Sequence, residues 1–324
     1  MNSTLNRREF LRNAALGLAC AGTMPAPLAG EEPAATLEPV VIDTHTHFYD
    51  PSRPQGVPWP PKDDAVLYRT VLPGTYRALP QPRAVTGTVV IEASPWLDDN
   101  QWVLDLAEKE PFIVGFVGNL PAGQPAFREQ LKRFSGHPVF RGIRLRPAPA
   151  KSRWEDSRFI ADLKLLAESD LSLDLVGGPE ILELAARLAR AVPPLRIVID
   201  HLAGLRIDGK ALPGEWVEAM QTAAKYPSVF CKVSGLVEGS GQRDGKAPRD
   251  TEFYRPTLDA IWRLCGDDRL VYGSNWPVCE HYAAVATVQR IVLEYFTAKG
   301  SAALEGVLSG NARRAYKWTH RKAR

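Results

Sequence analysis

The chain has 324 residues, of which 45% are hydrophobic and 24% are charged. These values are ordinary for a soluble globular enzyme, and the length suffices for one large α/β barrel or two modest domains. The formal net charge is only +3 and no basic block precedes the tail at 313–324, so nucleic acid is not an expected partner. The four cysteines show no CxxC spacing, which indicates neither a disulfide framework nor a cysteine-ligated zinc site.

The amino-terminal residues 1–30 are typical of an export signal, and 31–39 of a linker. The pair Arg7-Arg8 precedes a short apolar run, as in bacterial twin-arginine signals. This run is too short to cross a bilayer. We therefore expect export of the folded protein to the periplasm or another extracytoplasmic site, with no integral membrane span. A lipid anchor at Cys20 is the alternative.

The first motif after this leader is an apolar run that ends in two histidines, at 40–48. Side chains two residues apart in a strand share a face, so His45 and His47 should project together from the strand end. Two such imidazoles make half of a metal site, or a pair of donors for a developing oxyanion. Two polar residues that only cap the strand are the alternative.

A proline-rich loop at 51–61 follows this strand and contains Trp59. Long ordered loops are uncommon between elements unless they are functional. We therefore expect this loop to form a lid or a wall over a site, with the tryptophan available to a small-molecule ligand.

Beyond the loop, apolar β-branched runs alternate with segments of helical periodicity. Strands are expected at 88–93, 113–118, 142–145, 171–176, 196–199, 229–233 and 270–272. Helices are expected at 102–109, 127–134, 159–167, 181–191, 216–224, 258–264, 284–296 and 303–308. With the opening strand, these units predict a single-domain (β/α)8 TIM barrel over 40–320. A doubly wound open sheet is the alternative, although no glycine-rich nucleotide fingerprint follows the first strand.

Polar side chains follow several of these strands, at the end where TIM barrels carry their active sites. Glu92 ends the second strand, where a carboxylate is seldom left unpaired. Arg144 and Arg146 share a face of the fourth strand and suit bidentate binding of a substrate carboxylate. A structural ion pair with Glu92 or Asp174 is the alternative for these arginines.

The last three strands add further polar residues. Asp200 and His201 follow the sixth strand, and as neighbours they are expected to face opposite ways. Lys232 lies on the seventh strand, and Asn275 and Trp276 stand at the rim after the eighth. Three histidines at strand ends, out of six in the chain, indicate a site more than they indicate structural roles.

Seven motifs in this order resemble the amidohydrolase superfamily. The resemblance is to the amidohydrolase-related (amidohydrolase 2) branch of TIM-barrel hydrolases, which includes sugar lactonases and 2-pyrone-4,6-dicarboxylate lactonase. The motifs are IDTHTHF at 42–48, VIEAS at 90–94, RGIRLRP at 141–147, VIDHLAG at 198–204, KVSGL at 232–236, YGSNWPV at 272–278 and GNARRAY at 310–316.

The resemblance implies that His45 and His47 hold a metal or polarise a carbonyl, with His201, Glu92 and Asn275 completing the catalytic group. The family usually has an aspartate where this chain has Asn275. That aspartate accepts the proton of the attacking water, and it ligates the ion in metal-bound members. Asparagine is neither a base near neutral pH nor a strong ligand, and no histidine follows the fifth strand, where metal-bound members often carry one. The resemblance therefore implies two alternatives: a zinc ion on His45 and His47, or no metal, as in some lactonases of this family.

These observations predict a hydrolase that opens a small lactone of a sugar acid or carboxylated ring, by attack of water on a polarised carbonyl. Arg144 and Arg146 would bind the substrate, and Trp59 and Trp276 would wall its pocket. One alternative is a metal-dependent amide hydrolase or decarboxylase. Another is a barrel that binds a ligand without catalysis, because of Asn275. The expected partner is in each case a small molecule.

Overall fold

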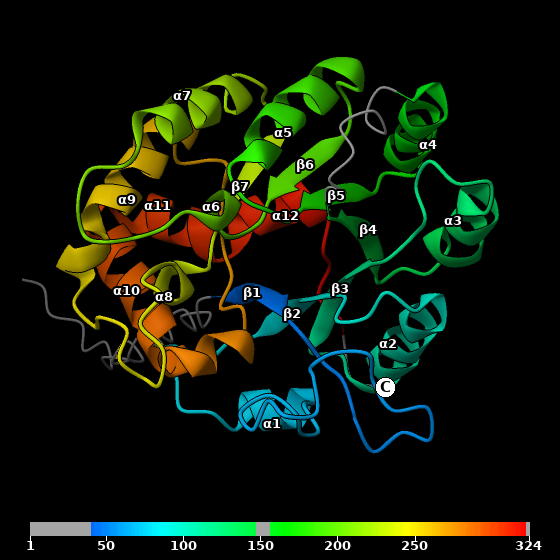
Figure 1. Ribbon diagram of the computed structural model, residues 1–324, viewed down its shortest axis with the longest axis horizontal. Coiled ribbons are helices and arrows are strands. Elements are labelled where there is room, and N and C mark those ends of the chain that lie inside the picture. The colour runs from blue at the N-terminus through cyan, green and yellow to red at the C-terminus, as the bar shows by residue number, and fades with distance from the viewer. Residues whose placement is uncertain (1–39, 147–155, 322–324) are drawn as a thin grey trace, which may run out of the picture. The chain divides into compact units, whose positions relative to one another are not determined.

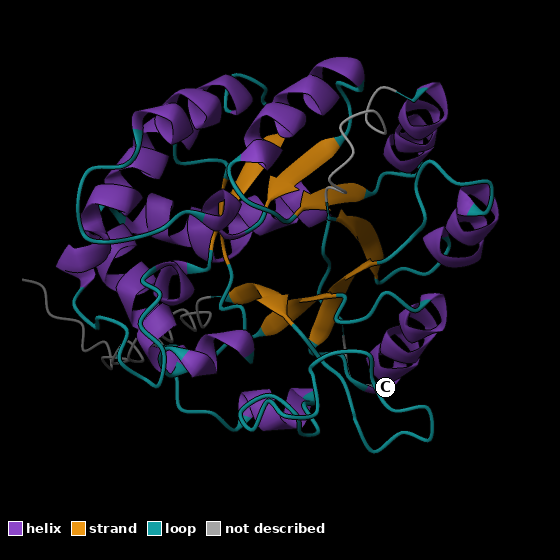
Figure 2. Cartoon of the chain, in the orientation of Figure 1, coloured by secondary structure: helices purple, strands orange, loops and turns teal. Residues whose placement is uncertain are grey.

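The sheet of this protein runs in sequence order from β1 to β8, and every neighbouring pair is parallel. The computed structural model describes residues 40–146 and 156–321. The expected export signal and linker lie outside the described residues. Figure 1 shows the strands arranged around a common axis, and Figure 2 shows the helices outside them.

Most of the strands are apolar on both faces, which suits a parallel sheet that is covered on both sides, whereas the segments IDTHT at 42–46 and SLDL at 172–175 also carry buried polar side chains. Every residue of six of the eight strands is buried. The strands are β1 (Ile42–Thr46), β2 (Gly87–Ile91), β3 (Ile113–Gly118), β4 (Phe140–Leu145), β5 (Ser172–Leu175), β6 (Arg196–Ile199), β7 (Val229–Val233) and β8 (Leu270–Tyr272).

The first and last strands meet and close the sheet. Thr46 forms a parallel bridge with Trp276, and the backbone N–H of His47 donates to the Trp276 carbonyl at 2.9 Å. The Thr44 hydroxyl donates to the Tyr272 carbonyl at 2.6 Å. The expected TIM barrel is therefore confirmed for the described residues, and the doubly wound open sheet is wrong.

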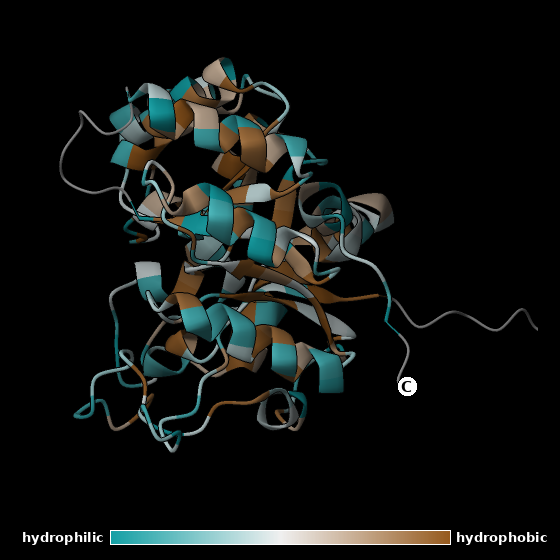
Figure 3. Ribbon diagram, turned by 90° about the vertical axis from the view of Figure 1, so that its right-hand side faces the viewer, coloured by the Kyte–Doolittle hydropathy of each residue, from teal (hydrophilic) through white to brown (hydrophobic). Residues whose placement is uncertain are grey.

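The outer helices turn apolar faces to the sheet and polar faces outward, as the colours of Figure 3 show. Two of them begin at aspartates, because the carboxylates of Asp156 and Asp250 accept from backbone N–H groups of the first turn. The helical segments are α1 (Pro73–Arg77), α2 (Leu97–Lys109), α3 (Phe127–Ser135), α4 (Ser157–Glu168), α5 (Glu180–Ala191), α6 (His201–Gly204), α7 (Gly214–Ala223), α8 (Leu236–Gly239), α9 (Thr251–Cys265), η2 (Val278–His281), α10 (Val285–Ala298), α11 (Ser301–Glu305), η3 (Gly306–Gly310) and α12 (Asn311–Tyr316).

The long helices confirm the predicted ones, whereas α1, α6, α8, η2 and α12 were not expected. Segments of four to six residues are too short to show helical periodicity. Within the described part of the chain, no helix combines the length and the apolar character that crossing a bilayer requires.

One end of the barrel interior is filled by α12. Ala312 and Ala315 pack with the inward side chains Val198, Phe230 and Val271. The carbonyl of Ala315 accepts from the Arg196 guanidinium at 2.8 Å, and Arg196 is the first residue of β6. Helix α12 therefore fills the barrel at the amino-terminal ends of the strands. The polar residues lie at the opposite, carboxyl-terminal ends.

Candidate active site

Three histidines from distant parts of the sequence meet at the carboxyl ends of the strands. The ring centroid of His45, in β1, lies 5.0 Å from that of His47 and 4.3 Å from that of His201. His45 has no exposed surface and His47 only 5%, whereas His201 is half-buried. The structure thus brings together the imidazoles that the sequence predicts for one site.

The turn after β6 aims both Asp200 and His201 at this cluster, so the expectation that they face opposite ways is wrong. Side-chain alternation holds only while the backbone is extended. Here β6 ends at Ile199, and His201 adopts a left-handed φ of 50°. Ligand atoms of His45, Asp200 and His201 lie within 4.8 Å of one another. Left-handed non-glycine residues of this kind cluster at functional sites.

Two glycines allow the strand ends to approach the imidazoles. A Cβ at Gly235, whose φ is 67°, would lie 2.7 Å from the His201 Cβ. A Cβ at Gly273 would lie 2.8 Å from the His45 Cβ. The segments that follow β7 and β8 therefore pass directly beside His201 and His45.

A buried ammonium lies beneath the histidines. Lys232 Nζ donates to Asp174 Oδ2 at 2.7 Å and lies 3.1 Å from His45 Nδ1. It also lies 2.8 Å from Asp200 Oδ1, as an ion pair without hydrogen-bond alignment. Burial raises the pKa of Asp174 to about 6 against the pull of Lys232. Burial acts in the same sense on Asp200, but the charge of Lys232 holds the pKa of this carboxyl well below its usual range.

The lysine fixes the tautomer of His45. An ammonium can only donate, so Nδ1 of His45 accepts from it and the ring proton sits on Nε2. This Nε2 is buried and has no hydrogen-bond partner among the described residues. Burial, reinforced by the charge of Lys232, keeps the pKa of His45 well below its usual range. His45 therefore presents a neutral N–H donor to which the described part of the chain offers no acceptor.

The other two imidazoles are also neutral near pH 7. Burial, with the nearby charge of Arg144, lowers the pKa of His47 to about 3. Burial lowers that of His201 to about 4, although Asp200 opposes the shift. His47 Nδ1 lies 2.9 Å from the Ile91 carbonyl and must donate to it, which leaves a lone pair on Nε2. The Nδ1 of His201 shares a hydrogen bond of 2.8 Å with Ser234 Oγ.

Glu92 and Arg144 form the ion pair that the sequence left open as a structural alternative. Arg144 Nε donates to Glu92 Oε1 at 2.7 Å, and a second guanidinium nitrogen donates to the Glu92 backbone carbonyl at 2.5 Å. Arg146 is exposed. All three residues line a cleft of about 390 Å³. The structure therefore gives Arg144 a partner within the protein and leaves Arg146 at the cleft surface.

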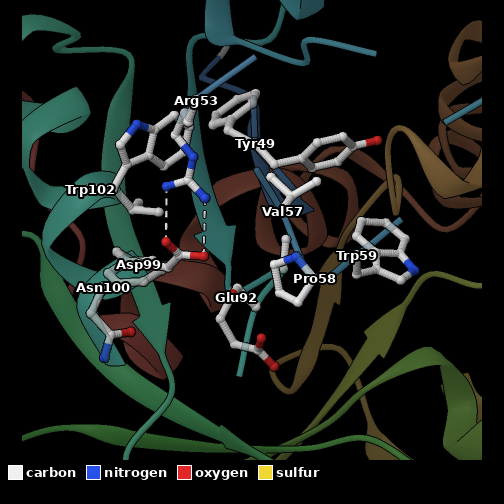
Figure 4. Close-up of a pocket in the computed structure, with 14 residues that line it drawn as sticks. Tyr49, Arg53, Val57, Pro58, Trp59, Glu92, Asp99, Asn100 and Trp102 are labelled. Atoms are coloured by element: carbon white, nitrogen blue, oxygen red, sulfur yellow. Dashed lines mark hydrogen bonds and ion pairs between the residues drawn. The ribbon is translucent and has the colours of Figure 1, made fainter. Parts of the chain in front are cut away.

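The loop between β1 and α1 is fixed over one side of the site. Tyr49 and Val71 exchange backbone hydrogen bonds of 3.0 and 2.9 Å at its base. Arg53 binds the Asp99 carboxylate through two nitrogens, as the dashed lines in Figure 4 show. The Trp59 ring lies 5.6 Å from that of His47. Trp59 and Glu92 line a small cavity of about 20 Å³, room for little more than a water molecule.

Trp276 and Asn275 end in different surroundings. Trp276 has no exposed surface, and its ring lies 5.0 Å from that of Tyr76. Its side chain is therefore part of the core, and not the exposed pocket wall that the sequence led us to expect. Asn275, with a φ of 58°, donates from Nδ2 to Glu238 Oε1 at 2.8 Å. Sequence reasoning missed Glu238; the only signal was a single carboxylate in the otherwise apolar or small LVEG segment.

The donor set fits a divalent metal in part. His45, Asp200 and His201 offer two imidazoles and a carboxylate, which suit zinc, and the buried Nε2 of His45 lacks a partner among the described residues. The sequence analysis named His45 and His47 as the metal ligands, whereas the group that the structure brings together is His45, Asp200 and His201. Lys232 already lies against Asp200 and His45, so this chain supplies a cation of its own at the same place.

The fold and the site together define a TIM barrel with a polar, imidazole-rich centre at the carboxyl ends of its strands. Comparison with known proteins agrees with this class. The amidohydrolase family profile matches residues 42–318. The chain therefore belongs to the amidohydrolase family.

Similar proteins include two curated lactonases and a solved structure. The chain is 31% identical to L-fucono-1,5-lactonase of Burkholderia ambifaria over 239 residues, which cover 73% of this chain and 80% of that protein. It is 30% identical to L-fucono-1,5-lactonase of Burkholderia multivorans, over 85% of this chain and 95% of that protein. A zinc-bound amidohydrolase from Burkholderia multivorans superposes with a TM-score of 0.77 at 26% identity, covering 86% of this chain and 100% of that one.

Proposed function

We propose that this chain hydrolyses the 1,5-lactone of a sugar acid, with L-fucono-1,5-lactone as the first substrate to test. The observation that carries the proposal is the buried Nε2–H of His45, which has no acceptor among the described residues. A lactone carbonyl oxygen would supply that acceptor. The names of the two Burkholderia relatives support the choice of ring and substrate class.

His45 would act most strongly on the transition state. As water attacks the carbonyl carbon, negative charge develops on the carbonyl oxygen, and a pre-oriented donor in a buried site stabilises it. The hydrogen bond from Lys232 to Nδ1 of His45 holds the tautomer that this donation requires, and Asp174 holds the lysine. His47 and His201, neutral near pH 7, would accept hydrogen bonds from water or substrate hydroxyls.

The cleft that Arg144 and Arg146 line suits a polar ring. Glu92 and Arg146 line this cleft, and both can bind hydroxyl groups of a sugar acid. Trp59 stands on the side of His47, where an aromatic face can pack against the apolar side of the ring. An ester is a more activated acyl group than an amide, so the site needs a weaker base for lactone opening than for amide hydrolysis.

A divalent ion, if bound, would be held by His45, Asp200 and His201 and would polarise the carbonyl as a Lewis acid. Because Lys232 already pairs with Asp200, we propose that the chain's own groups suffice for the reaction.

The purified protein is expected to release acid from L-fucono-1,5-lactone, measured by pH-stat titration, at a rate well above spontaneous opening. After dialysis against a chelator, confirmed by elemental analysis, at least about half of the rate should remain. Loss of the rate on chelation, with recovery on added zinc, would show that the ion is required. No turnover with any sugar 1,5-lactone, together with ligand-induced stabilisation, would favour the non-catalytic alternative.

We also propose that the protein works outside the cytoplasm, on the basis of the Arg7-Arg8 motif. Changing both arginines to lysine should retain the protein in the cytoplasm, because twin-arginine export reads this pair. Fractionation of cells that express the full chain, followed by immunoblotting, measures this. Equal periplasmic amounts of the unmodified and variant chains would contradict the proposal.

A further inference from the structure

Lactone hydrolysis needs a general base that accepts the proton of the attacking water. Asn275 cannot be this base, because an amide has no basic site near neutral pH. Asn275 Nδ2 donates to Glu238 Oε1 at 2.8 Å. This bond fixes the amide orientation, so Oδ1 faces away from the carboxylate. An acid is therefore present beside the amide, on the neighbouring segment instead of on the strand-eight residue.

The two chain segments that carry this pair both start beside the histidines. Glu238 lies in α8, which begins directly after Gly235, and Gly235 packs against the Cβ of His201. Asn275 follows Gly273, which packs against the Cβ of His45. The hydrogen bond between them therefore joins the segments that follow β7 and β8, and each of these segments passes an imidazole at its first glycine.

One oxygen of this carboxylate is unused. Glu238 Oε2 is buried and has no hydrogen-bond partner among the described residues. A buried acceptor without a partner costs free energy, and native structures almost always satisfy such groups with protein or water. A water molecule that donates a hydrogen to Glu238 Oε2 would satisfy this oxygen.

We propose that Glu238 is the general base of this site, with Asn275 holding the carboxylate in place. The inference rests on the proposed lactone hydrolysis. As the water oxygen bonds to the carbonyl carbon, one water proton passes to Glu238 Oε2. When the tetrahedral intermediate collapses, the bond from carbon to ring oxygen breaks, and the ring oxygen takes that proton. The product is a hydroxy acid, and Glu238 returns to the carboxylate.

The surroundings of Glu238 suit this role. Burial raises its pKa to about 7, and the hydrogen bond from Asn275 opposes the shift. The charge of Glu238 raises the pKa values of two titratable neighbours, Tyr254 and Cys279. Both neighbours are neutral near pH 7. A base is most effective when its pKa lies near the working pH.

Replacement of Glu238 by glutamine is expected to lower kcat on L-fucono-1,5-lactone by about 10²-fold or more, with KM little changed. In the unmodified protein, kcat/KM should fall below pH 7, where the carboxylate becomes protonated. This acid limb should be absent from the residual activity of the variant. Glu252→Gln, on the exposed start of α9, is the matched control. This variant should keep the kcat of the unmodified protein and the same fall of kcat/KM below pH 7.

A double variant separates catalysis from structural support. Asn275→Asp in the Glu238→Gln background puts a carboxylate on the neighbouring side chain, and it should restore at least about tenfold of the lost rate. A full rate and an unchanged acid limb in Glu238→Gln would overturn the assignment while lactone hydrolysis stands. A reduced melting temperature without rescue would make Glu238 a structural residue and would also overturn it. Absence of turnover by the unmodified protein would overturn both this assignment and the proposed function.

Discussion

Replacement of Lys232 by methionine is expected to destabilise the folded chain by about 3–5 kcal/mol, the usual cost of removing one partner from a buried ion pair. Lys232, Asp174 and Asp200 all have 0% exposed side-chain surface. Without the ammonium, two buried carboxylates would lose the charge that compensates them. Denaturant unfolding monitored by circular dichroism measures this change. Lys246→Met, which affects an exposed pair, is the control and should leave the unfolding free energy almost unchanged.

The pH dependence gives this prediction a sign. In the unmodified protein the pKa of Asp200 lies well below its ordinary value of 3.8, so its contribution to stability is present above that value and is lost as the pH falls. Without Lys232, burial should raise the pKa of both aspartates, so stability should fall as the pH rises above about 4. A variant as stable at pH 7 as the unmodified chain would contradict the ion network.

Replacement of His45 by alanine is expected to lower kcat on a sugar 1,5-lactone by about 10²–10³-fold, the usual effect of removing one oxyanion donor. The loss should appear in kcat more than in KM, because the interaction strengthens as negative charge develops in the transition state. Steady-state kinetics by pH-stat titration measure it.

Two variants control for this change. His137→Ala removes a histidine near the surface, paired with Glu108, and should leave the rate unaltered. His45→Gln keeps an amide N–H near the same place and should lose less activity than the alanine variant. An alanine variant that is folded and fully active would show that His45 is not the donor, whatever the other imidazoles do.

The barrel was predictable because its signals are local. The apolar runs at Ile113–Gly118 and Val229–Val233 coincide with β3 and β7, and the long amphipathic segments between strands became helices. Since the carboxyl ends of parallel barrel strands share one mouth, the meeting of His45, His47 and His201 followed from strand order alone.

The remaining features depend on backbone turns that no periodic pattern reports. The left-handed backbone conformation of His201 brings its imidazole and the Asp200 carboxylate into one cluster. Glu238 lies on a helix of four residues, which is too short to be found by periodicity. The ring of Trp276 belongs to the core although its neighbour Asn275 reaches Glu238. The tautomer of His45 depends on contact with Lys232, which lies 187 residues away in the sequence.

The central claim is that the imidazole cluster of this barrel directs water onto a lactone carbonyl. The most direct measurement is turnover of L-fucono-1,5-lactone in water labelled with heavy oxygen, with the product analysed by mass spectrometry. We predict catalysed opening with one label in the new carboxylate, and loss of this catalysis in the His45→Ala variant. A rate no higher than spontaneous opening, or label found in the hydroxyl that the ring oxygen becomes, would contradict the account.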